Sequence, residues 1–95
     1  MRVEWSADAV ADLKTISEWI ERDRSLETAN RVTRSIYDSI HSLRRMPHRG
    51  RYGRLEGTRE LVVPKLPYLV IYRIGEDHVL ILAVLHGAQS RRANR

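Results

Sequence analysis

The chain of 95 residues contains no cysteine. It can therefore form neither disulfides nor thiolate metal sites, and its stability has to come from packing or from a bound partner. A chain this short builds one domain with a single modest core. We expect one domain over residues 1–95 that ends in a loose tail from 90 to 95, and a place in the cytoplasm, where disulfides are rare.

Long apolar runs are also missing. The first ten residues, MRVEWSADAV, lack an apolar core long enough for a secretory signal. No later run approaches the roughly 20 apolar residues that cross a bilayer. The sequence therefore predicts neither a secretory signal nor a membrane-spanning segment, and we expect no membrane among the partners of the chain.

Motifs for cofactor and metal chemistry are absent as well. The glycines at positions 50, 53 and 57 lack both the preceding strand and the following Lys-Ser/Thr of a phosphate-binding loop. The four histidines fall at no metal-ligand spacing, and neither an HExxH motif nor a carboxylate facial triad can be assembled. No serine lies in a nucleophile elbow. We expect no cofactor and no metal.

Charge is distributed unevenly along the chain. Residues 1–38 carry 6 Lys/Arg and 8 Asp/Glu, a net charge of −2, whereas residues 39–95 carry 11 and 4, a net charge of +7. Arginine supplies 15 of the 17 cations. Its planar guanidinium suits bidentate binding of carboxylate or phosphate, although a genome rich in G and C would produce the same preference for arginine over lysine.

Hydrophobic periodicity predicts a strand and two helices in the first half. Residues 2–5 alternate charged and apolar side chains, as a half-buried strand does. Ser6 and Ser25 are placed as N-caps of two amphipathic helices, which run over residues 7–22 and from Ser25 to about residue 46. The short turn between them predicts an antiparallel helical hairpin. Trp5 and Trp19 are expected in its core rather than as stacking platforms for nucleic acid.

Three strands are predicted in the second half, over residues 59–63, 68–74 and 79–86. Their short connections make an antiparallel meander, and the last two strands are apolar on both faces, which indicates central positions in the sheet. The expected fold class is α+β in the order β-α-α-β-β-β. It is an antiparallel sheet with the N-terminal helical hairpin packed on one face.

The densest cluster of charge is the basic loop, residues 44–54, which holds five arginines and no acid. Crowded cations in a loop repel one another, and binding of a polyanion is favourable because it offsets this repulsion. The segment is therefore a candidate surface for phosphates or an acidic protein. A solvated loop without a partner is the alternative. With two arginines of the tail, the candidate target-binding residues are Arg44, Arg45, Arg49, Arg51, Arg54, Arg91 and Arg92.

The ends of the predicted strands carry a second group. Arg59 opens the first strand of the meander, Arg73 closes the second and His86 ends the third. A histidine beside guanidinium groups could act as general acid or base in RNA cleavage while the arginines stabilise a pentavalent phosphate. Alternatively, the two arginines form local ion pairs, Arg73 across the turn that follows it, and His86 is a satisfied edge residue.

The predicted order of elements, with the segments LRRMPHRGR, GTRELVV, PYLVIYRI and VLILAVLHGAQ, resembles the RelE/ParE superfamily of toxins from bacterial and plasmid-stabilising addiction modules. The likeness covers nearly the whole chain and depends on the order and spacing of these segments. It implies a cognate antitoxin encoded beside the toxin, whose extended acidic or amphipathic C-terminal segment wraps the toxin.

The resemblance implies two mechanisms: RelE-like members cut messenger RNA on the ribosome, and ParE-like members poison DNA gyrase. RNA-cutting members typically carry an arginine after the aromatic residue of the second meander strand, where this chain has Leu69 after Tyr68. They also carry basic or tyrosine residues after the last strand, where Gly87 and Ala88 follow His86. The segments YRI and VLHGAQ are closer to ParE-like members.

We therefore predict a non-enzymatic, ParE-like toxin that acts on gyrase. A RelE-like mRNA endonuclease that uses Arg59, Arg73 and His86 is the alternative. A plain RNA-binding module without toxic action is the third hypothesis, and it predicts salt-sensitive binding of naked RNA without growth arrest.

Overall fold

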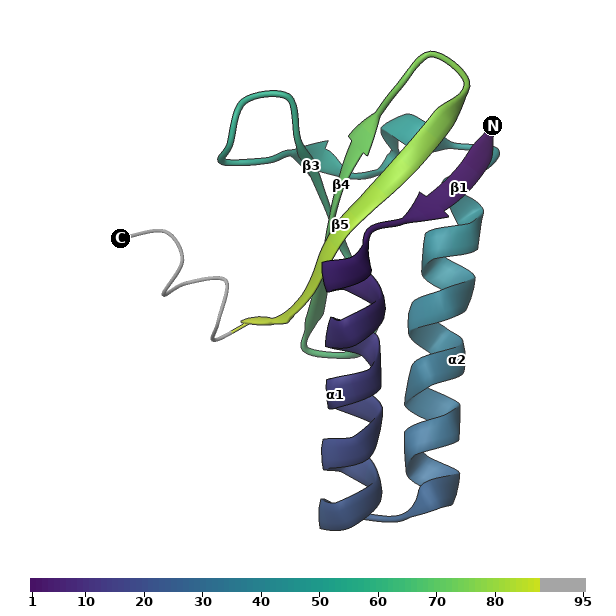
Figure 1. Cartoon of the computed structure of the whole chain (residues 1–95), viewed down its shortest axis with the longest axis vertical. Helices are drawn as coiled ribbons and strands as arrows, with labels where there is room; N and C mark the ends of the chain where they lie inside the picture. Colours follow the sequence, from purple (N-terminus) through teal and green to yellow (C-terminus); the bar gives the residue numbers. More distant parts are fainter. Residues whose placement is uncertain (88–95) are drawn as a thin grey trace.

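Two long helices lie side by side and cover one face of a five-stranded sheet in the computed structural model, which describes residues 1–87 (Figure 1). The helical hairpin extends beyond the lower end of the strands (Figure 1). The elements are β1 (Arg2–Trp5), α1 (Ala7–Asp23), α2 (Leu26–Ser42), the 3-10 helix η1 (Pro47–Arg49), β2 (Arg51–Tyr52), β3 (Arg59–Val62), β4 (Tyr68–Ile74) and β5 (His78–His86). The predicted tail over residues 90–95 lies outside the described range.

The strands are arranged in the order β1-β5-β4-β3-β2. The predicted α+β class and order of elements are confirmed, and β4 and β5 occupy interior positions as expected. β1 runs parallel to β5, with Arg2 opposite His78 and Trp5 opposite Ile81, so the sheet is mixed rather than wholly antiparallel. Periodicity locates a strand but does not identify its partner, and the partner of β1 lies near the other end of the chain.

The segment after α2 is more structured than the sequence predicted. α2 ends at Ser42 rather than near residue 46, and η1 and the short edge strand β2 follow it. β2 pairs with β3 in antiparallel register, with Arg51 opposite Glu60 and Tyr52 opposite Arg59. A strand of two residues is too short to show an alternating pattern, which is why the basic loop was predicted as irregular.

A bulge in β5 attaches α1 to the sheet. The register between β4 and β5 shifts at residues 71–72, where Leu82 has no partner on β4. The hydroxyl of Ser6, the N-cap of α1, donates to the Leu82 carbonyl oxygen at 3.0 Å, and the Val84 N–H donates to Asp12 Oδ2 at 2.9 Å. The N-cap and the first turns of α1 therefore supply hydrogen-bond partners to backbone groups of β5 at the bulge and just beyond it.

The core lies between the helical hairpin and the sheet, with Ile36 and Ile40 of α2 against Val70, Tyr72 and Ile81. Trp5 is partly buried and packs against this cluster, as predicted. The prediction for Trp19 is wrong, since its side chain is 54% exposed. The next residue, Ile20, is 5% exposed and belongs to the core cluster, so the buried stripe of α1 runs through Ile20 and leaves Trp19 at the surface. No helix within residues 1–87 has the length and apolarity to span a bilayer.

Candidate functional site

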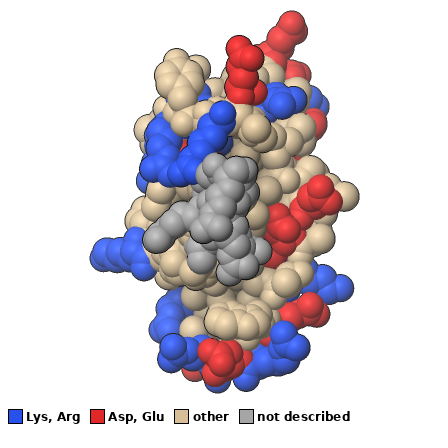
Figure 2. Space-filling view, turned by 90° about the vertical axis from the view of Figure 1, so that its left-hand side faces the viewer, with Lys and Arg blue, Asp and Glu red and all other residues tan. Residues whose placement is uncertain are grey.

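The basic loop presents its arginines to solvent. All five are exposed between the end of α2 and the turn before β3. In Figure 1 the turn between β2 and β3 projects to the left. Figure 2, which faces that side, shows one group of Lys and Arg side chains in its upper part, and others mixed with Asp and Glu at the lower end. Exposed cations crowded on one surface create a positive potential that attracts an anionic partner.

Tyr72 of β4 holds the start of the basic loop. Its buried hydroxyl donates to the Pro47 carbonyl oxygen at 2.6 Å and accepts from the Gly50 N–H at 2.9 Å. Burial raises the pKa of the Tyr72 phenol above its usual value of 10.0, although the Gly50 amide and two nearby arginines oppose this. The phenol therefore stays protonated at neutral pH and continues to donate.

Glycine is required at position 50 because the loop passes so close to the sheet. A Cβ there would lie 2.6 Å from the Tyr72 hydroxyl oxygen and 2.7 Å from the Glu60 carbonyl oxygen. Both distances are too short for nonbonded atoms, and one of the two neighbours is backbone. The close approach at Gly50 and the hydrogen bonds of Tyr72 thus fix where the basic loop leaves the core.

The fold supplies an acid that the sequence of the basic loop lacks. Glu60 Oε1 accepts from Arg51 Nε at 3.2 Å and from Arg51 Nη2 at 3.1 Å, and Oε2 accepts from the Arg54 N–H at 3.4 Å. The side chain of Glu60 is 8% exposed and that of Arg51 is 61% exposed. The charge of Arg51 is therefore partly offset, whereas Arg44, Arg45 and Arg54 form no ion pair within residues 1–87.

Arg59 is held beside the basic loop by three contacts. Its Nη1 donates to the Gly50 carbonyl oxygen at 2.8 Å and, more weakly, to that of His48 at 3.5 Å. Its guanidinium carbon lies 4.3 Å from the centroid of the Tyr52 ring. Tyr52 is 81% exposed. The sequence places this tyrosine in the basic loop but assigns it no role, because only the β2–β3 register places it opposite Arg59.

The structure does not bring Arg59, Arg73 and His86 together. His86 lies opposite Tyr68 at the start of β4, and Arg59 lies opposite Tyr72, four residues further along that strand. At the rise of a strand this separation is roughly 13 Å. Arg73 follows Tyr72, so its exposed side chain is on the opposite face of the sheet from that of Arg59. The ring of His86 packs edge-on against Tyr68, with centroids 5.6 Å apart.

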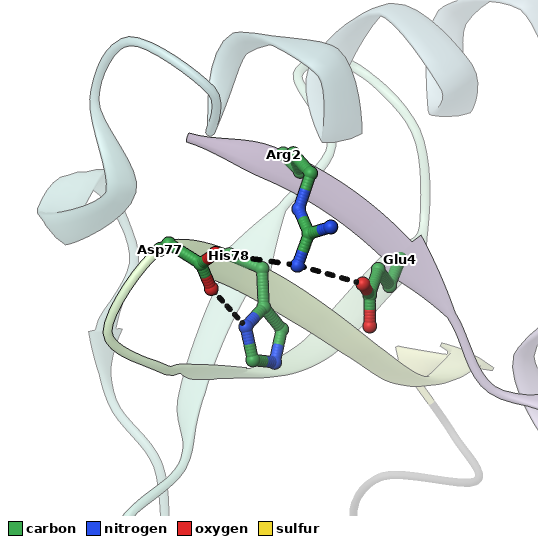
Figure 3. Close-up of polar contacts among 4 residues, drawn as sticks. All are labelled: Arg2, Glu4, Asp77 and His78. Atoms are coloured by element: carbon green, nitrogen blue, oxygen red, sulfur yellow. Dashed lines mark hydrogen bonds and ion pairs between the residues drawn. The ribbon is translucent and has the colours of Figure 1, made fainter.

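Arg73 was expected to pair with Glu76 or Asp77 across the turn, but it forms no ion pair within residues 1–87, and Asp77 is engaged elsewhere, as Figure 3 shows. Asp77 Oδ2 lies 3.4 Å from Arg2 Nη2, and Asp77 Oδ1 lies 3.1 Å from His78 Nδ1. The hydrogen bond with His78 and the charge of Arg2 lower the pKa of Asp77. Arg2 also pairs with Glu4 at 3.3 Å. These contacts connect β1 to the β4–β5 turn, but ion pairs so open to solvent contribute little stability.

Four of the predicted target-binding arginines line two separate depressions, and Arg49 lines neither of them. One is a depression of about 560 Å³ lined by Met1, His41, Ser42, Arg44, Arg45 and Met46. The other is a depression of about 270 Å³ lined by Arg51, Arg54, Val62, Leu66, Pro67, Tyr68, Leu69 and Gly87. Arg91 and Arg92 lie outside the described residues. Within residues 1–87, no group of three or more His, Asp or Glu side chains is placed to hold a metal ion.

The helical hairpin carries an apolar groove of its own. Its volume is about 360 Å³, and it is lined by Trp5, Val10, Leu13, Lys14, Ser17, Thr33 and Tyr37. Val10 is 54% exposed, and the rings of Trp5 and Tyr37 are stacked with their centroids 6.3 Å apart. The Thr33 hydroxyl in this lining is buried and has no hydrogen-bond partner among the described residues. Exposed apolar side chains gathered in one groove are typical of a protein-binding surface.

Comparison with known proteins assigns the fold and the family. Residues 3–91 match the family model of the ParE toxin of the type II toxin-antitoxin system, parDE. The protein named "Putative toxin Y4kP" from Sinorhizobium fredii is 40% identical over 88 residues, which cover 93% of this chain and 90% of that protein.

Solved structures share the same fold. A chain of the chromosomal ParDE TA system from P. aeruginosa has a TM-score of 0.86 at 23% identity, covering 90% of this chain and 95% of that one. The YoeB/ParE toxin from Agrobacterium tumefaciens has a TM-score of 0.62 at 17% identity, covering 90% and 98%. With the family match over nearly its whole length, the chain belongs to the ParE toxin family of type II toxin-antitoxin systems.

Proposed function

We propose that this chain, as a ParE-family toxin, inhibits DNA gyrase through its basic loop and is neutralised by a cognate antitoxin. The observation that supports gyrase over RNA cleavage is the separation of Arg59, Arg73 and His86. General acid-base catalysis needs the acid or base and the stabilising cation within hydrogen-bond reach of one phosphate. Arg59 is held by backbone carbonyls, and His86 lies at the opposite end of β4.

An assay of gyrase supercoiling tests this proposal. The purified chain is added to gyrase and relaxed plasmid, and we expect loss of supercoiling. Charge reversal by Arg45→Glu with Arg54→Glu should abolish inhibition, because neither guanidinium has an ion-pair partner to lose within residues 1–87. The matched control is Arg22→Glu with Arg31→Glu, which makes the same charge change on exposed helix positions and should leave inhibition intact.

Induction of the chain in a bacterial host separates the two mechanisms. Inhibition of gyrase predicts filamentation with a DNA damage response and intact transcripts. Rapid transcript cleavage on translating ribosomes would instead establish the RelE-like mRNA endonuclease. Since gyrase and ribosomes are both cytoplasmic, we place the chain in the cytoplasm in either case.

We further propose that the apolar groove of the helical hairpin binds an amphipathic segment of the antitoxin. Toxins of this class pair with an antitoxin, and this groove offers the exposed apolar side chains that such a segment covers. Val10→Asp should weaken the complex at least tenfold, because a carboxylate would be buried against apolar atoms. Ala11→Asp is the control, since Ala11 is exposed on α1 but does not line the groove. Equal affinities of both variants would assign the antitoxin to another surface.

A further inference from the structure

The most exposed aromatic ring of the molecule, that of Tyr52, is supported on one face by an arginine. Tyr52 is 81% exposed, yet it lies in β2, paired with Arg59 of β3. The Arg59 guanidinium covers one face of the ring at 4.3 Å and is itself bonded to the Gly50 carbonyl oxygen. A ring supported on one face leaves the other face open to solvent. Little side-chain freedom remains to be lost when a planar group stacks on that face.

The ring lies within a strongly basic segment of the chain. Residues 44–60 contain six arginines and two glutamates, a net charge of +4. One of the two acids, Glu60, is 8% exposed and is already bound by Arg51. The guanidinium of Arg49 donates to the neutral Ser42 hydroxyl at 2.6 Å. Neither Arg49 nor Arg54 has an ion-pair partner among residues 1–87. An anionic chain that passes the ring therefore meets guanidinium groups along its path.

We infer that the basic loop binds single-stranded nucleic acid, with one base stacked on the open face of Tyr52 and the adjacent phosphates on the arginines. Flexible single strands offer both a planar base and regularly spaced phosphates, and aromatic side chains within a cationic groove are the usual way to bind them. In a duplex the base faces are covered by their neighbours. An acidic peptide satisfies the arginines but gains nothing from a supported aromatic ring. The inference rests on the proposed role of the basic loop as the target-binding surface.

The test is fluorescence anisotropy with the whole chain and a labelled oligothymidylate, without gyrase. Tyr52→Ala should weaken binding about tenfold, which is within the range for loss of one stacked base. Tyr52→Trp should retain affinity. Leu55→Ala is the matched control, because Leu55 is 72% exposed in the same turn but has no aromatic face, and its affinity should equal that of the unaltered chain.

Two probes distinguish the ligand class. Duplex DNA of the same sequence should bind more weakly, and its affinity should be the same for the unaltered chain and for Tyr52→Ala. Oligoglutamate should fail to displace the oligothymidylate at equal charge concentration. The inference is overturned if Tyr52→Ala and Leu55→Ala bind the single strand with equal affinity. It is also overturned if oligoglutamate displaces the oligothymidylate fully, which would indicate an acidic protein as the partner.

The result is independent of the gyrase assay. If the chain binds oligothymidylate through Tyr52 but has no effect on supercoiling, this inference stands and gyrase is rejected as the target. Inhibition of supercoiling that is unchanged by Tyr52→Ala, with no oligothymidylate binding, would reject the inference and retain gyrase. The two proposals therefore fail separately.

Discussion

Tyr68 and Tyr72 are two buried tyrosines on the same face of β4, and the two ends of the strand use them differently. Burial raises the pKa of both phenols. The Tyr72 hydroxyl makes two hydrogen bonds to the backbone of the basic loop. The Tyr68 hydroxyl makes none within residues 1–87, and its ring packs against His86. At the Tyr72 end, β4 therefore holds the basic loop in place through hydrogen bonds. At the Tyr68 end, the tyrosine contributes a packing contact.

The largest effect should come from Gly50, the glycine next to Tyr72. Gly50→Ala places a Cβ 2.6 Å from the Tyr72 hydroxyl and 2.7 Å from the Glu60 carbonyl, so the loop has to move, and we expect a loss of about 3 kcal/mol in the free energy of unfolding. Gly87→Ala is the control, because its Cβ would lie 3.6 Å from the Pro67 carbonyl oxygen, an ordinary contact. Urea denaturation measures both. Equal losses would show that the two ends of β4 are equally tolerant.

Removal of the two hydroxyls should have the next largest effect. Tyr72→Phe leaves the buried Gly50 N–H without its partner and removes a donor to Pro47, so we expect destabilisation by about 2 kcal/mol. Tyr68→Phe removes no hydrogen bond within the described residues and should change stability by less than about 0.5 kcal/mol. Amide hydrogen exchange of the basic loop should accelerate only in Tyr72→Phe. Acceleration in both variants would contradict the anchoring role assigned to Tyr72.

Alkaline pH should reduce the difference between Tyr72→Phe and the unaltered chain. The pKa of Tyr72 is raised in the folded state, so above pH 10 the native chain retains a proton that the unfolded chain releases. The stability contributed by the protonated phenol is complete below about pH 10 and is lost as the pH rises toward the folded-state pKa. Tyr72→Phe has no such proton to lose. Urea denaturation of both chains at a series of pH values checks this prediction. A stability difference between them that stays constant above pH 10 would contradict it.

The sequence predicted the elements of the fold better than their pairing. The caps Ser6 and Ser25 begin α1 and α2 as expected, because their side chains accept hydrogen bonds from the first helical turn. The parallel pairing of β1 was not predictable, since alternation in four residues does not identify a partner. Burial of Trp19 was predicted from helical spacing, but spacing does not decide which of two adjacent apolar residues faces the core, and here Ile20 is buried and Trp19 is exposed.

The candidate site was predicted in composition and not in geometry. The exposed arginines of the basic loop are where the sequence placed them. Their neighbours depend on the β2–β3 register, which places Glu60 opposite Arg51 and Tyr52 opposite Arg59. No local pattern encodes a register set by a two-residue strand, so the acid and the aromatic ring could be found only in the fold.

The smallest effect is expected for Arg73→Gln. Its side chain is exposed on the face of the sheet opposite Arg59, and Asp77 is already paired with Arg2 and His78. Stability should change by less than about 0.5 kcal/mol, because the variant removes one solvated charge. Inhibition of supercoiling should remain at the level of the unaltered chain. Loss of toxicity in Arg73→Gln, with the fold intact by circular dichroism, would mean that the open face of the sheet takes part in binding the target and that the basic loop does not act alone.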